Sequence, residues 1–316
     1  MRIAILDDYY QRAQNYANWG SANFATVDFI HEHIEDENKL VEALLSYEAV
    51  GLMRERTSFT RSLIERLPNL RLIVTTGKQN ASIDISAASE HGVTVCGTSS
   101  PGHATAELAF MLIMMLCRNV MPLVNGLKND GVWQPKMGAD LRAKTLGILG
   151  LGRLGSQVAK LGQTIGMNVI AWSTNLTEKT CAEHGVRYVT KTALFEESDF
   201  VSIHLKLSDR SKHLVGSQEL ELLGPNGYLV NTSRAEIINT EEALKALDND
   251  LIAGLATDVY TKEPANQKNP FVNHKRVLAT PHIGYCTEET FEVFYTDMLE
   301  AFEGFNKGQP INVINP

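Results

Sequence analysis

The stretch KTLGILGLGRLG, residues 144–155, decides the fold class of this chain. An apolar strand pattern runs into Gly150, Gly152 and Gly155, and a helical pattern follows from Ser156. In βαβ units that bind dinucleotides, the first glycine of G-x-G-x-x-G permits a tight turn and the second lets backbone approach a pyrophosphate. The third lets the following helix pack on the strand. The first N–H groups of that helix then point toward the anion. The stretch therefore predicts a dinucleotide-binding unit.

Short apolar runs alternate with helical patterns on both sides of this loop, which is typical of α/β proteins with parallel sheets. Strands are predicted over residues 2–6, 49–53, 70–75, 93–96, 145–149, 169–172, 200–205, 228–231, 254–257 and 277–279. The helices that matter most for the domain organisation are predicted over 37–46, 60–67, 83–91, 102–118, 156–165 and 288–305.

The order of these patterns predicts two α/β domains, because the last helix comes after the second series of strands has ended. We predict that residues 1–99 and 286–316 form a substrate domain. Residues 100–285 are predicted to form a dinucleotide-binding domain inserted into it. Each is expected to be a doubly wound, Rossmann- or flavodoxin-like parallel sheet, and a cleft between two such domains is a natural binding site.

Composition narrows the class of protein further. The net charge of -8 argues against non-specific binding to nucleic acid, and no apolar run approaches the ~20 residues that cross a bilayer. Cys96, Cys117, Cys181 and Cys286 lie far apart without a CxxC pair, which indicates neither a metal site nor a disulfide framework. The sequence therefore predicts a cytoplasmic protein without a bound metal or a membrane partner.

The strand after the glycine loop departs from the usual dinucleotide pattern. An acidic residue at its end normally binds the adenosine ribose hydroxyls, but residues 169–172 run into Ser173 and Thr174. The repulsion that excludes a 2′-phosphate is thus missing, although no arginine stands beside these residues in the sequence to hold one. Lys206 or Lys179 could take that role, so the choice between NAD and NADP stays open.

Three polar residues follow successive predicted strands: Arg234, Glu263 and His282. Hydride transfer to a 2-oxo acid needs a cation for the carboxylate, an acid for the carbonyl oxygen and a group that tunes that acid. Open α/β sheets bind ligands at the carboxyl ends of their strands, where these side chains are expected. Other histidines, such as His31 and His33, have no such context and are interpreted as solvated.

These motifs together resemble the D-isomer-specific 2-hydroxyacid dehydrogenases over nearly the whole chain. The resemblance depends on GLGRLG at 150–155, HLKLSDRS at 204–211, NTSRAEIIN at 231–239, DVYTKEP at 258–264 and PHIG at 281–284. It implies that Arg234 orients the substrate carboxylate and carbonyl and that His282 is the general acid or base. Glu263 would hydrogen-bond His282 and keep it protonated for reduction.

The same resemblance implies an oxidoreductase that moves a hydride between NAD(P)H and the carbonyl carbon of a 2-oxo acid, giving a D-2-hydroxy acid. Within the family, the chain resembles phosphoglycerate dehydrogenases and glyoxylate–hydroxypyruvate reductases, and the resemblance implies a short form without a regulatory domain. Asp258 is expected to face the nicotinamide carboxamide. The implied cofactor-binding residues are Gly150, Gly152, Arg153, Leu154, Gly155, Ser173, Thr174, Leu205, Thr232, Ser233, Asp258 and Gly284.

Substrate contacts are expected in the N-terminal region. Family members bind the substrate carboxylate there through backbone N–H groups of a glycine-containing loop. This chain keeps Gly77 but has Lys78 and Gln79 where small residues are usual. Arg54 and Arg56 match arginines that reach a substrate phosphate in phosphoglycerate dehydrogenases. Lys78 with Arg54 would suit a substrate with two anionic groups, or the arginines pair with nearby acids.

The sequence leaves two alternatives to this dehydrogenase function, and it also predicts that two copies of the chain associate. The chain could be a dinucleotide-sensing binding protein like the family's transcriptional corepressors. It could also be a phosphite-type dehydrogenase, since phosphite dehydrogenase has a lysine at the position aligned with Lys78. A homodimer is predicted because residues 108–116 form a helix that is apolar almost all round, and relatives place that region in the subunit interface.

Overall fold

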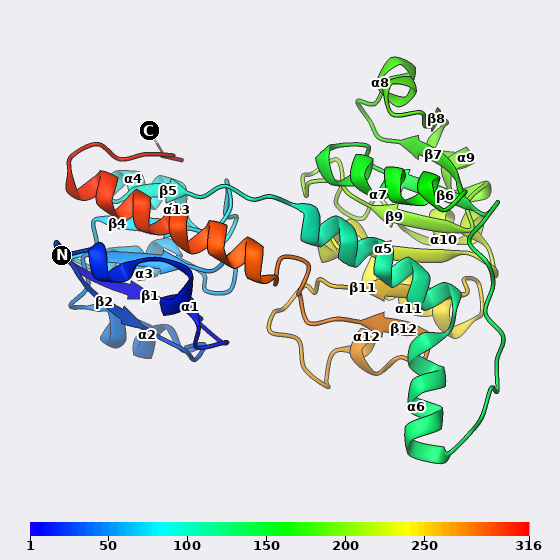
Figure 1. Ribbon diagram of the computed structural model, residues 1–316, viewed down its shortest axis with the longest axis horizontal. Helices are drawn as coiled ribbons and strands as arrows, with labels where there is room; N and C mark the ends of the chain where they lie inside the picture. The colour runs from blue at the N-terminus through cyan, green and yellow to red at the C-terminus, as the bar shows by residue number, and fades with distance from the viewer. Residues whose placement is uncertain (316) are drawn as a thin grey trace. The chain divides into compact units, whose positions relative to one another are not determined.

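The computed structural model describes residues 1–315, which divide into two compact units (Figure 1). Unit 1 consists of Met1–Pro101 together with the chain from Cys286 onward, and unit 2 is Gly102–Tyr285. Unit 2 is thus inserted into unit 1, and each unit is built on its own parallel sheet.

Unit 1 contains a five-stranded parallel sheet in the order β2-β1-β3-β4-β5, the flavodoxin-like arrangement. Its strands are β1 (Arg2–Ile5), β2 (Thr26–Phe29), β3 (Ala49–Leu52), β4 (Leu72–Thr75) and β5 (Thr94–Gly97). Its helices are α1 (Ala13–Tyr16), the 3-10 turn η1 (Trp19–Ser21), α2 (Glu37–Leu44), α3 (Arg61–Glu65), α4 (Ile85–Glu90) and α13 (Glu288–Asn306). β2 was not predicted, because this edge strand is only partly buried and has no apolar run.

Strand alternation explains how unit 1 covers both faces of its sheet. Val50 and Leu52 point into a core that α2, α3 and α4 close. Gly51 lies on the other face, where a Cβ would be 2.5 Å from Sδ of Met298 in α13. Glycine therefore allows the long C-terminal helix to approach the sheet closely.

Unit 2 contains a seven-stranded parallel sheet in the order β12-β11-β10-β9-β6-β7-β8. Its strands are β6 (Thr145–Leu149), β7 (Asn168–Trp172), β8 (Arg187–Tyr188), β9 (Phe200–Ile203), β10 (Tyr228–Asn231), β11 (Gly254–Thr257) and β12 (Val277–Ala279). Its helices are α5 (His103–Cys117), α6 (Val120–Asp130), α7 (Arg153–Thr164), α8 (Glu178–Glu183), α9 (Lys191–Glu196), α10 (Ser217–Leu223), η2 (Ala235–Ile237), α11 (Thr240–Asp248) and α12 (Pro270–Asn273).

The strand order of unit 2 is that of a Rossmann fold. From β6 the chain runs outward to β7 and β8, then returns to β9 and runs outward the other way. The reversal between β6 and β9 is the topological switch point, where such sheets bind their ligands. The glycine loop that follows β6 lies at this point.

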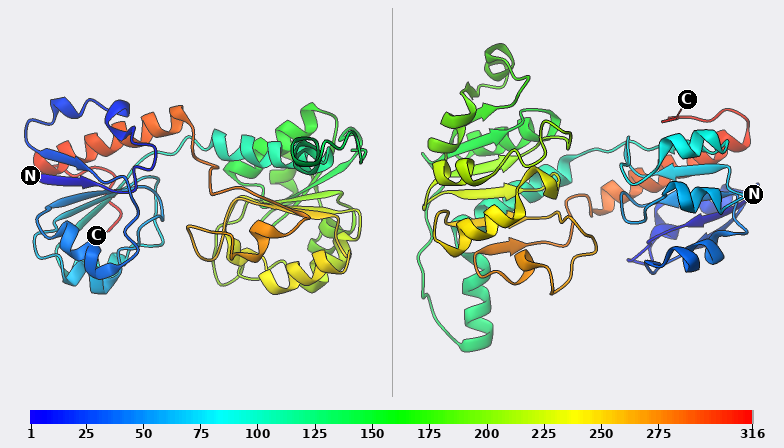
Figure 2. Two further views of the ribbon diagram at one scale, coloured as in Figure 1. Left: turned by 90° about the horizontal axis from the view of Figure 1, so that it is seen from below. Right: turned by 180° about the vertical axis from the view of Figure 1, so that it is seen from behind.

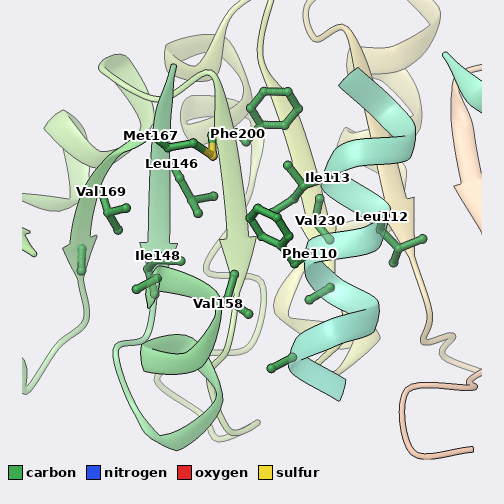
Figure 3. Packing of buried hydrophobic residues seen from close by; sticks show 14 of the residues in the cluster. Phe110, Leu112, Ile113, Leu146, Ile148, Val158, Met167, Val169, Phe200 and Val230 are labelled. Atoms are coloured by element: carbon green, nitrogen blue, oxygen red, sulfur yellow. The ribbon is translucent and has the colours of Figure 1, made fainter. Parts of the chain in front are cut away.

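Helices cover both faces of the unit 2 sheet (Figure 2). On one face, Phe110 and Ile113 of α5 pack with Leu146, Phe200 and Val230 of the sheet, as Figure 3 shows. Burying each such side chain contributes roughly 1.5–3 kcal/mol. This core explains why the sequence of α5 is so apolar.

α5 and the segment after it also present apolar side chains to solvent. The exposed ones are Met111, Met114, Met121, Val124, Leu127, Val132, Trp133 and Met137, which we call the α5–α6 surface. Among residues 1–315, no single helix is long and apolar enough to span a membrane. α5 and α6 reach that length and composition only as a pair bent by 62°.

Candidate active site

Three neighbouring strands of unit 2 bring the predicted catalytic residues to one edge of the sheet. Arg234 follows β10, Glu263 follows β11 and His282 follows β12. β11 pairs in parallel with both β10 and β12, so their carboxyl ends share this edge. The glycine loop after β6 leaves the same edge, because every strand of the sheet is parallel to its neighbours.

His282 and Glu263 form a direct pair, with Nδ1 of the histidine 2.5 Å from Oε2 of the glutamate. The other carboxylate oxygen accepts the backbone N–H of Tyr260 at 2.9 Å. The Tyr260 hydroxyl in turn donates to the carbonyl of Thr280 at 2.8 Å, and burial raises the pKa of this phenol. These bonds tie the two loops together. The His282 ring also meets the Tyr285 ring edge-on, with centroids 5.5 Å apart.

Asp258 braces the loop that carries His282. The carboxylate is 1% exposed and accepts the Thr280 hydroxyl at 2.6 Å, the N–H of Ile283 at 2.9 Å and the N–H of Gly284 at 2.8 Å. Burial raises the Asp258 pKa, while these three hydrogen bonds act in the opposite direction. His282 has a left-handed backbone, φ 52°, which costs free energy unless its surroundings enforce it. The bonds to Asp258 on either side supply that constraint.

The turn after β10 holds Arg234 through the side chain of Asn231. The Asn231 amide donates to the carbonyl of Arg234 at 2.9 Å, and its oxygen accepts the N–H of Ser233 at 3.0 Å. The Ser233 hydroxyl donates to the carbonyl of Ile203 at 2.9 Å, which fixes the turn to β9. Arg234 itself is partly buried, and its Nη1 donates to the Ser233 carbonyl at 2.8 Å.

The glycine loop has the geometry that a bound pyrophosphate requires. Gly150 has φ 106°, and a Cβ there would be 2.8 Å from the carbonyl oxygen of His204. A Cβ on Gly155 would overlap the carbonyl oxygen of Gly150, whereas one on Gly152 would meet nothing within 4 Å. α7 begins directly after Gly152 without a side-chain cap or an acidic residue in its first turn. Its N-terminal N–H groups are therefore suited to an anion.

Two buried side-chain atoms near the strand ends have no hydrogen-bond partner among the described residues. They are Oγ1 of Thr232, whose residue is 8% exposed, and Nδ1 of His204. The other histidine nitrogen lies 2.9 Å from the hydroxyl of Ser202, and burial lowers the His204 pKa to about 4. Unpaired buried polar atoms are rare and fit a site that a ligand completes. His204 was not predicted as a site residue, although it opens the HLKLSDRS motif.

The other expected cofactor contacts follow β7 and β9. Ser173 is partly buried and Thr174 is exposed, directly after β7. Leu205 follows β9 and lies against the glycine loop, since a Cβ on Gly150 would be 2.8 Å from its Cδ2. These residues therefore surround the switch point.

Arg153 and Gly284 connect the same edge to α5. The Arg153 guanidinium lies where a Cβ on Gly102 would be, immediately before α5. The Thr105 hydroxyl of α5 donates to the carbonyl of Gly284 at 2.8 Å. Leu154, in the first turn of α7, is partly buried.

In unit 1, two of the predicted substrate residues lie together. Arg54 Nη1 donates to the carbonyl of Thr76 at 3.1 Å, and its guanidinium occupies the space that a Cβ on Gly77 would need. Gly77 also has φ 86°, so both its left-handed backbone and the close approach of Arg54 require glycine here. Its N–H donates to the Thr98 hydroxyl at 2.8 Å and is therefore already engaged. Nε of Arg54 lies 3.6 Å from Glu55.

Lys78 and Gln79 differ from this pair because both are exposed. The backbone below them is close-packed, since a Cβ on Gly97 would lie 2.7 Å from the carbonyl oxygen of Gly77. Their loop is thus a tightly held backbone with two polar side chains at the surface.

A cluster around Asp7 was not anticipated from the sequence. Asp7 is 1% exposed, accepts the hydroxyl of Thr57 at 2.7 Å and lies 3.0 Å from Nδ1 of His33. The hydrogen bond to Asp7 raises the His33 pKa. Arg56 Nη1 donates to the Asp7 carbonyl at 2.8 Å. The interpretation of His33 as a solvated residue is wrong, because the fold pairs it with a buried carboxylate.

Nδ1 of His31 lies 3.2 Å from Asp8, which is 3% exposed. Beside this pair is a cavity of about 680 Å³, lined by Tyr9, Gln11, Ile30, His31, Glu32 and Ile34. These groups extend the polar edge of the unit 1 sheet from β1 to β2.

The geometry agrees with a known family. The family described as "D-isomer specific 2-hydroxyacid dehydrogenase, NAD binding domain" matches residues 110–284, more than half of the chain. The chain belongs to the D-isomer specific 2-hydroxyacid dehydrogenase family. The glyoxylate reductase of Thermococcus litoralis is 35% identical over 267 residues, covering 81% of this chain and 80% of that protein.

Other members of the family match 80% or more of this chain. The glyoxylate reductase of Aeropyrum pernix is 36% identical over 266 residues, 80% of this chain and 78% of that protein. The D-3-phosphoglycerate dehydrogenase of Methanocaldococcus jannaschii is 32% identical and covers 84% of this chain but 51% of its own length. A crystal structure of a putative D-3-phosphoglycerate dehydrogenase from Ralstonia solanacearum superimposes with a TM-score of 0.94. It shares 32% identity and covers 100% of this chain and 97% of its own.

Membership of this 2-hydroxyacid dehydrogenase family confirms the predicted fold class, two doubly wound parallel-sheet domains of Rossmann type. It also confirms the predicted class of reaction. The protein is an NAD(P)-dependent oxidoreductase of 2-hydroxy and 2-oxo acids.

Proposed function

We propose that this dehydrogenase reduces a small, unphosphorylated 2-oxo acid to the D-2-hydroxy acid, with His282, Glu263 and Arg234 as its catalytic residues. The observation that carries the proposal is the His282–Glu263 pair at one edge of a Rossmann sheet, with Arg234 at the end of the neighbouring strand. A nicotinamide cofactor supplies the hydride when it is bound. The residues of this chain bind and orient the substrate and exchange a proton with it.

His282 is suited to proton transfer because Glu263 occupies its Nδ1. Nε2 lies on the opposite side of the imidazole ring and is the atom that donates a proton to the substrate's carbonyl oxygen. The Glu263 carboxylate stabilises the imidazolium and fixes which nitrogen faces the substrate. The side chains are 24% and 30% exposed, so a substrate can reach the histidine.

Arg234 is suited to hold the substrate carboxylate, because a planar guanidinium offers two parallel N–H donors to two oxygens. The turn fixed by Asn231 and Ser233 limits the motion of its backbone. Less conformational entropy is then lost when the substrate binds.

The cofactor-binding assignment follows from the glycine loop and the strand ends around it. The N-terminus of α7 receives the pyrophosphate, and the buried Thr232 hydroxyl supplies an unused donor. Asp258 has about one acceptor position left after its three hydrogen bonds, which suits the nicotinamide carboxamide. Since Ser173 replaces the usual acid, we expect cofactor choice to be relaxed or to favour NADPH.

Substrate size is inferred from unit 1. Gly77, Lys78, Gln79 and Arg54 are the expected contacts. Arg54 is held by the Thr76 carbonyl and lies near Glu55, which weakens it as a receptor for a second anionic group. This arrangement favours a small acid such as glyoxylate or hydroxypyruvate over a phosphorylated one. The similarity to glyoxylate reductases supports the same choice.

We also infer a cytoplasmic homodimer. The α5–α6 surface leaves large apolar side chains in water, with Trp133 74% and Met137 94% exposed, and exposed apolar side chains that gather on one region are typical of a protein–protein contact. Cys96, Cys117, Cys181 and Cys286 form no disulfide bond within residues 1–315, which is compatible with a reducing compartment. Light scattering at micromolar concentration should give the mass of two chains. A mass near one chain would refute the dimer.

The activity is tested with purified protein and a panel of 2-oxo acids, each assayed with NADH and with NADPH. Glyoxylate, hydroxypyruvate and phosphohydroxypyruvate cover the small and phosphorylated classes, and oxidation of phosphite tests the phosphite-type alternative. We expect kcat/KM to be highest for an unphosphorylated acid. Turnover of phosphite alone would refute the proposal, and so would the absence of turnover with any acid. A preference for the phosphorylated acid that Lys78→Gln abolishes would instead establish a second anion site.

A further inference from the structure

The loop after β7 has the composition of a phosphate site but no cation of its own. Ser173 and Thr174 follow the strand, where an acid would accept ribose hydroxyls in an NAD-specific protein. Their hydroxyl groups are available as donors at this position, and Thr174 is exposed. The cation must therefore come from another part of the chain.

The structure brings an arginine from a distant segment to this loop. Nη1 of Arg210 lies 3.5 Å from Oδ1 of Asn175, which is two positions beyond Ser173. Arg210 belongs to the loop after β9, and β9 and β7 flank β6 in the sheet. The two loops thus approach each other at the switch point, beside the glycine loop.

The turn that carries Arg210 is firmly held. The Ser211 hydroxyl donates to the carbonyl of Lys206 at 2.7 Å and accepts the N–H of Ser208 at 2.8 Å. Ser211 is 5% exposed, so this anchor is shielded from water. Arg210 projects from the anchored turn as an exposed side chain. Across residues 1–315 it forms no ion pair, and its contact is to a neutral amide.

We propose that Arg210, with the hydroxyl groups of Ser173 and Thr174, binds the 2′-phosphate of NADPH and gives this protein its preference for NADPH over NADH. A guanidinium matches phosphate oxygens with two parallel donors and retains its charge at all working pH values. Asn175 holds the side chain near the site when the phosphate is absent. This inference rests on the proposed function only in placing the dinucleotide at the glycine loop.

The test uses two adenosine nucleotides that differ in one phosphate. Adenosine 2′,5′-bisphosphate and adenosine 5′-monophosphate are titrated calorimetrically into the intact wild-type protein and into Arg210→Gln. The wild type should bind the bisphosphate about tenfold more tightly, as one charge-assisted hydrogen-bonded pair implies. Arg210→Gln should lose that advantage and bind the monophosphate as the wild type does.

Lys212→Gln is the matched control, because Lys212 is an exposed cation on the same loop. It should keep the wild-type preference. Equal affinity of the wild type for both nucleotides would overturn the inference. So would an equal loss of preference in Lys212→Gln, or an Arg210→Gln protein that still prefers the bisphosphate.

Catalysis provides a separate readout. The ratio of kcat/KM with NADPH to that with NADH should fall about tenfold in Arg210→Gln, because the KM for NADPH rises while the KM for NADH does not. If the wild type turns over no 2-oxo acid yet shows the expected nucleotide preference, the proposed reaction fails and the phosphate site stands. If it turns over 2-oxo acids without the nucleotide preference, the reaction stands and the role of Arg210 is refuted.

Discussion

The carboxyl edges of the two sheets are assembled in different ways. In unit 2, neighbours in sequence hold the proposed catalytic side chains: Asn231 holds the turn of Arg234, and the backbone N–H of Tyr260 contacts Glu263. Asp258 then ties this loop to the one that carries His282. Most of the arrangement is built within short segments.

In unit 1, residues far apart in the sequence meet around a buried carboxylate. Asp7 follows β1, while His33 and Thr57 come from the segments after β2 and β3. Arg56 contacts the Asp7 carbonyl and stacks over the ring of Tyr9 at 4.2 Å. No local pattern encodes this cluster.

A site can be predicted from a sequence motif when the residues of the motif contact one another. A cluster whose residues come from distant strands has no such motif and cannot be predicted in this way. The comparison also separates two kinds of histidine pair. His282 has a partly exposed partner that a substrate can approach, whereas His33 has a partner that is 1% exposed. We therefore expect substitutions at the unit 2 edge to affect the rate and those around Asp7 to affect stability.

The largest effect is expected for His282→Ala. Removing a general acid typically costs ~10²–10⁴-fold in rate, so kcat for 2-oxo acid reduction should fall by that amount. The affinity for the dinucleotide, measured by titration, should stay within about twofold, since the glycine loop is untouched. A variant that keeps more than a tenth of wild-type kcat would show that the pair with Glu263 is structural.

Arg234→Lys should rank second. Lysine retains the charge but not the planar two-donor fork, so kcat/KM for 2-oxo acids should fall about 10²-fold. The dinucleotide affinity serves as the control and should not change. If kcat and KM both stay near wild type, Arg234 acts only in the turn after β10.

Asp258→Asn tests whether the brace matters to the histidine it supports. Either orientation of the new amide sets an NH₂ group against the N–H of Ile283 or of Gly284. We expect a loss of about 1–3 kcal/mol in the free energy of unfolding and, because His282 is less well placed, roughly a tenfold lower kcat. Denaturant unfolding and steady-state kinetics measure the two effects. An unchanged kcat in a destabilised protein would limit Asp258 to folding.

The smallest effect is expected at His33. Asp7 raises the His33 pKa, so the pair stabilises the fold fully below pH 6.5 and loses that contribution as pH rises through the raised pKa. His33→Gln should lower the free energy of unfolding by roughly 0.5–1 kcal/mol at pH 6 and by less at pH 9. His31→Gln is the control on the more exposed pair. An equal loss at both pH values would show that protonation of His33 is not involved.

The sequence predicted most buried strands accurately, because hydrophobic side chains at a strand's period mark them directly. Tyr228–Asn231, Gly254–Thr257 and Val277–Ala279 have the bounds that were predicted. β2 and β8 were missed, since edge strands need little apolar surface. α6 was also missed: none of its residues is buried, and its apolar side chains Met121, Val124 and Leu127 are exposed rather than packed in a core.

By itself, the sequence determined the family, the glycine loop and the motifs that contain the proposed catalytic residues, because each motif depends on residues within a few positions of one another. Only the tertiary structure decided that Asp7 is buried beside His33, that Arg54 lies over Gly77 and that Arg210 reaches Asn175. In each case the partners are separated by strands and helices. The sheet order brings them together, and that order follows from packing the whole chain rather than from any segment of it.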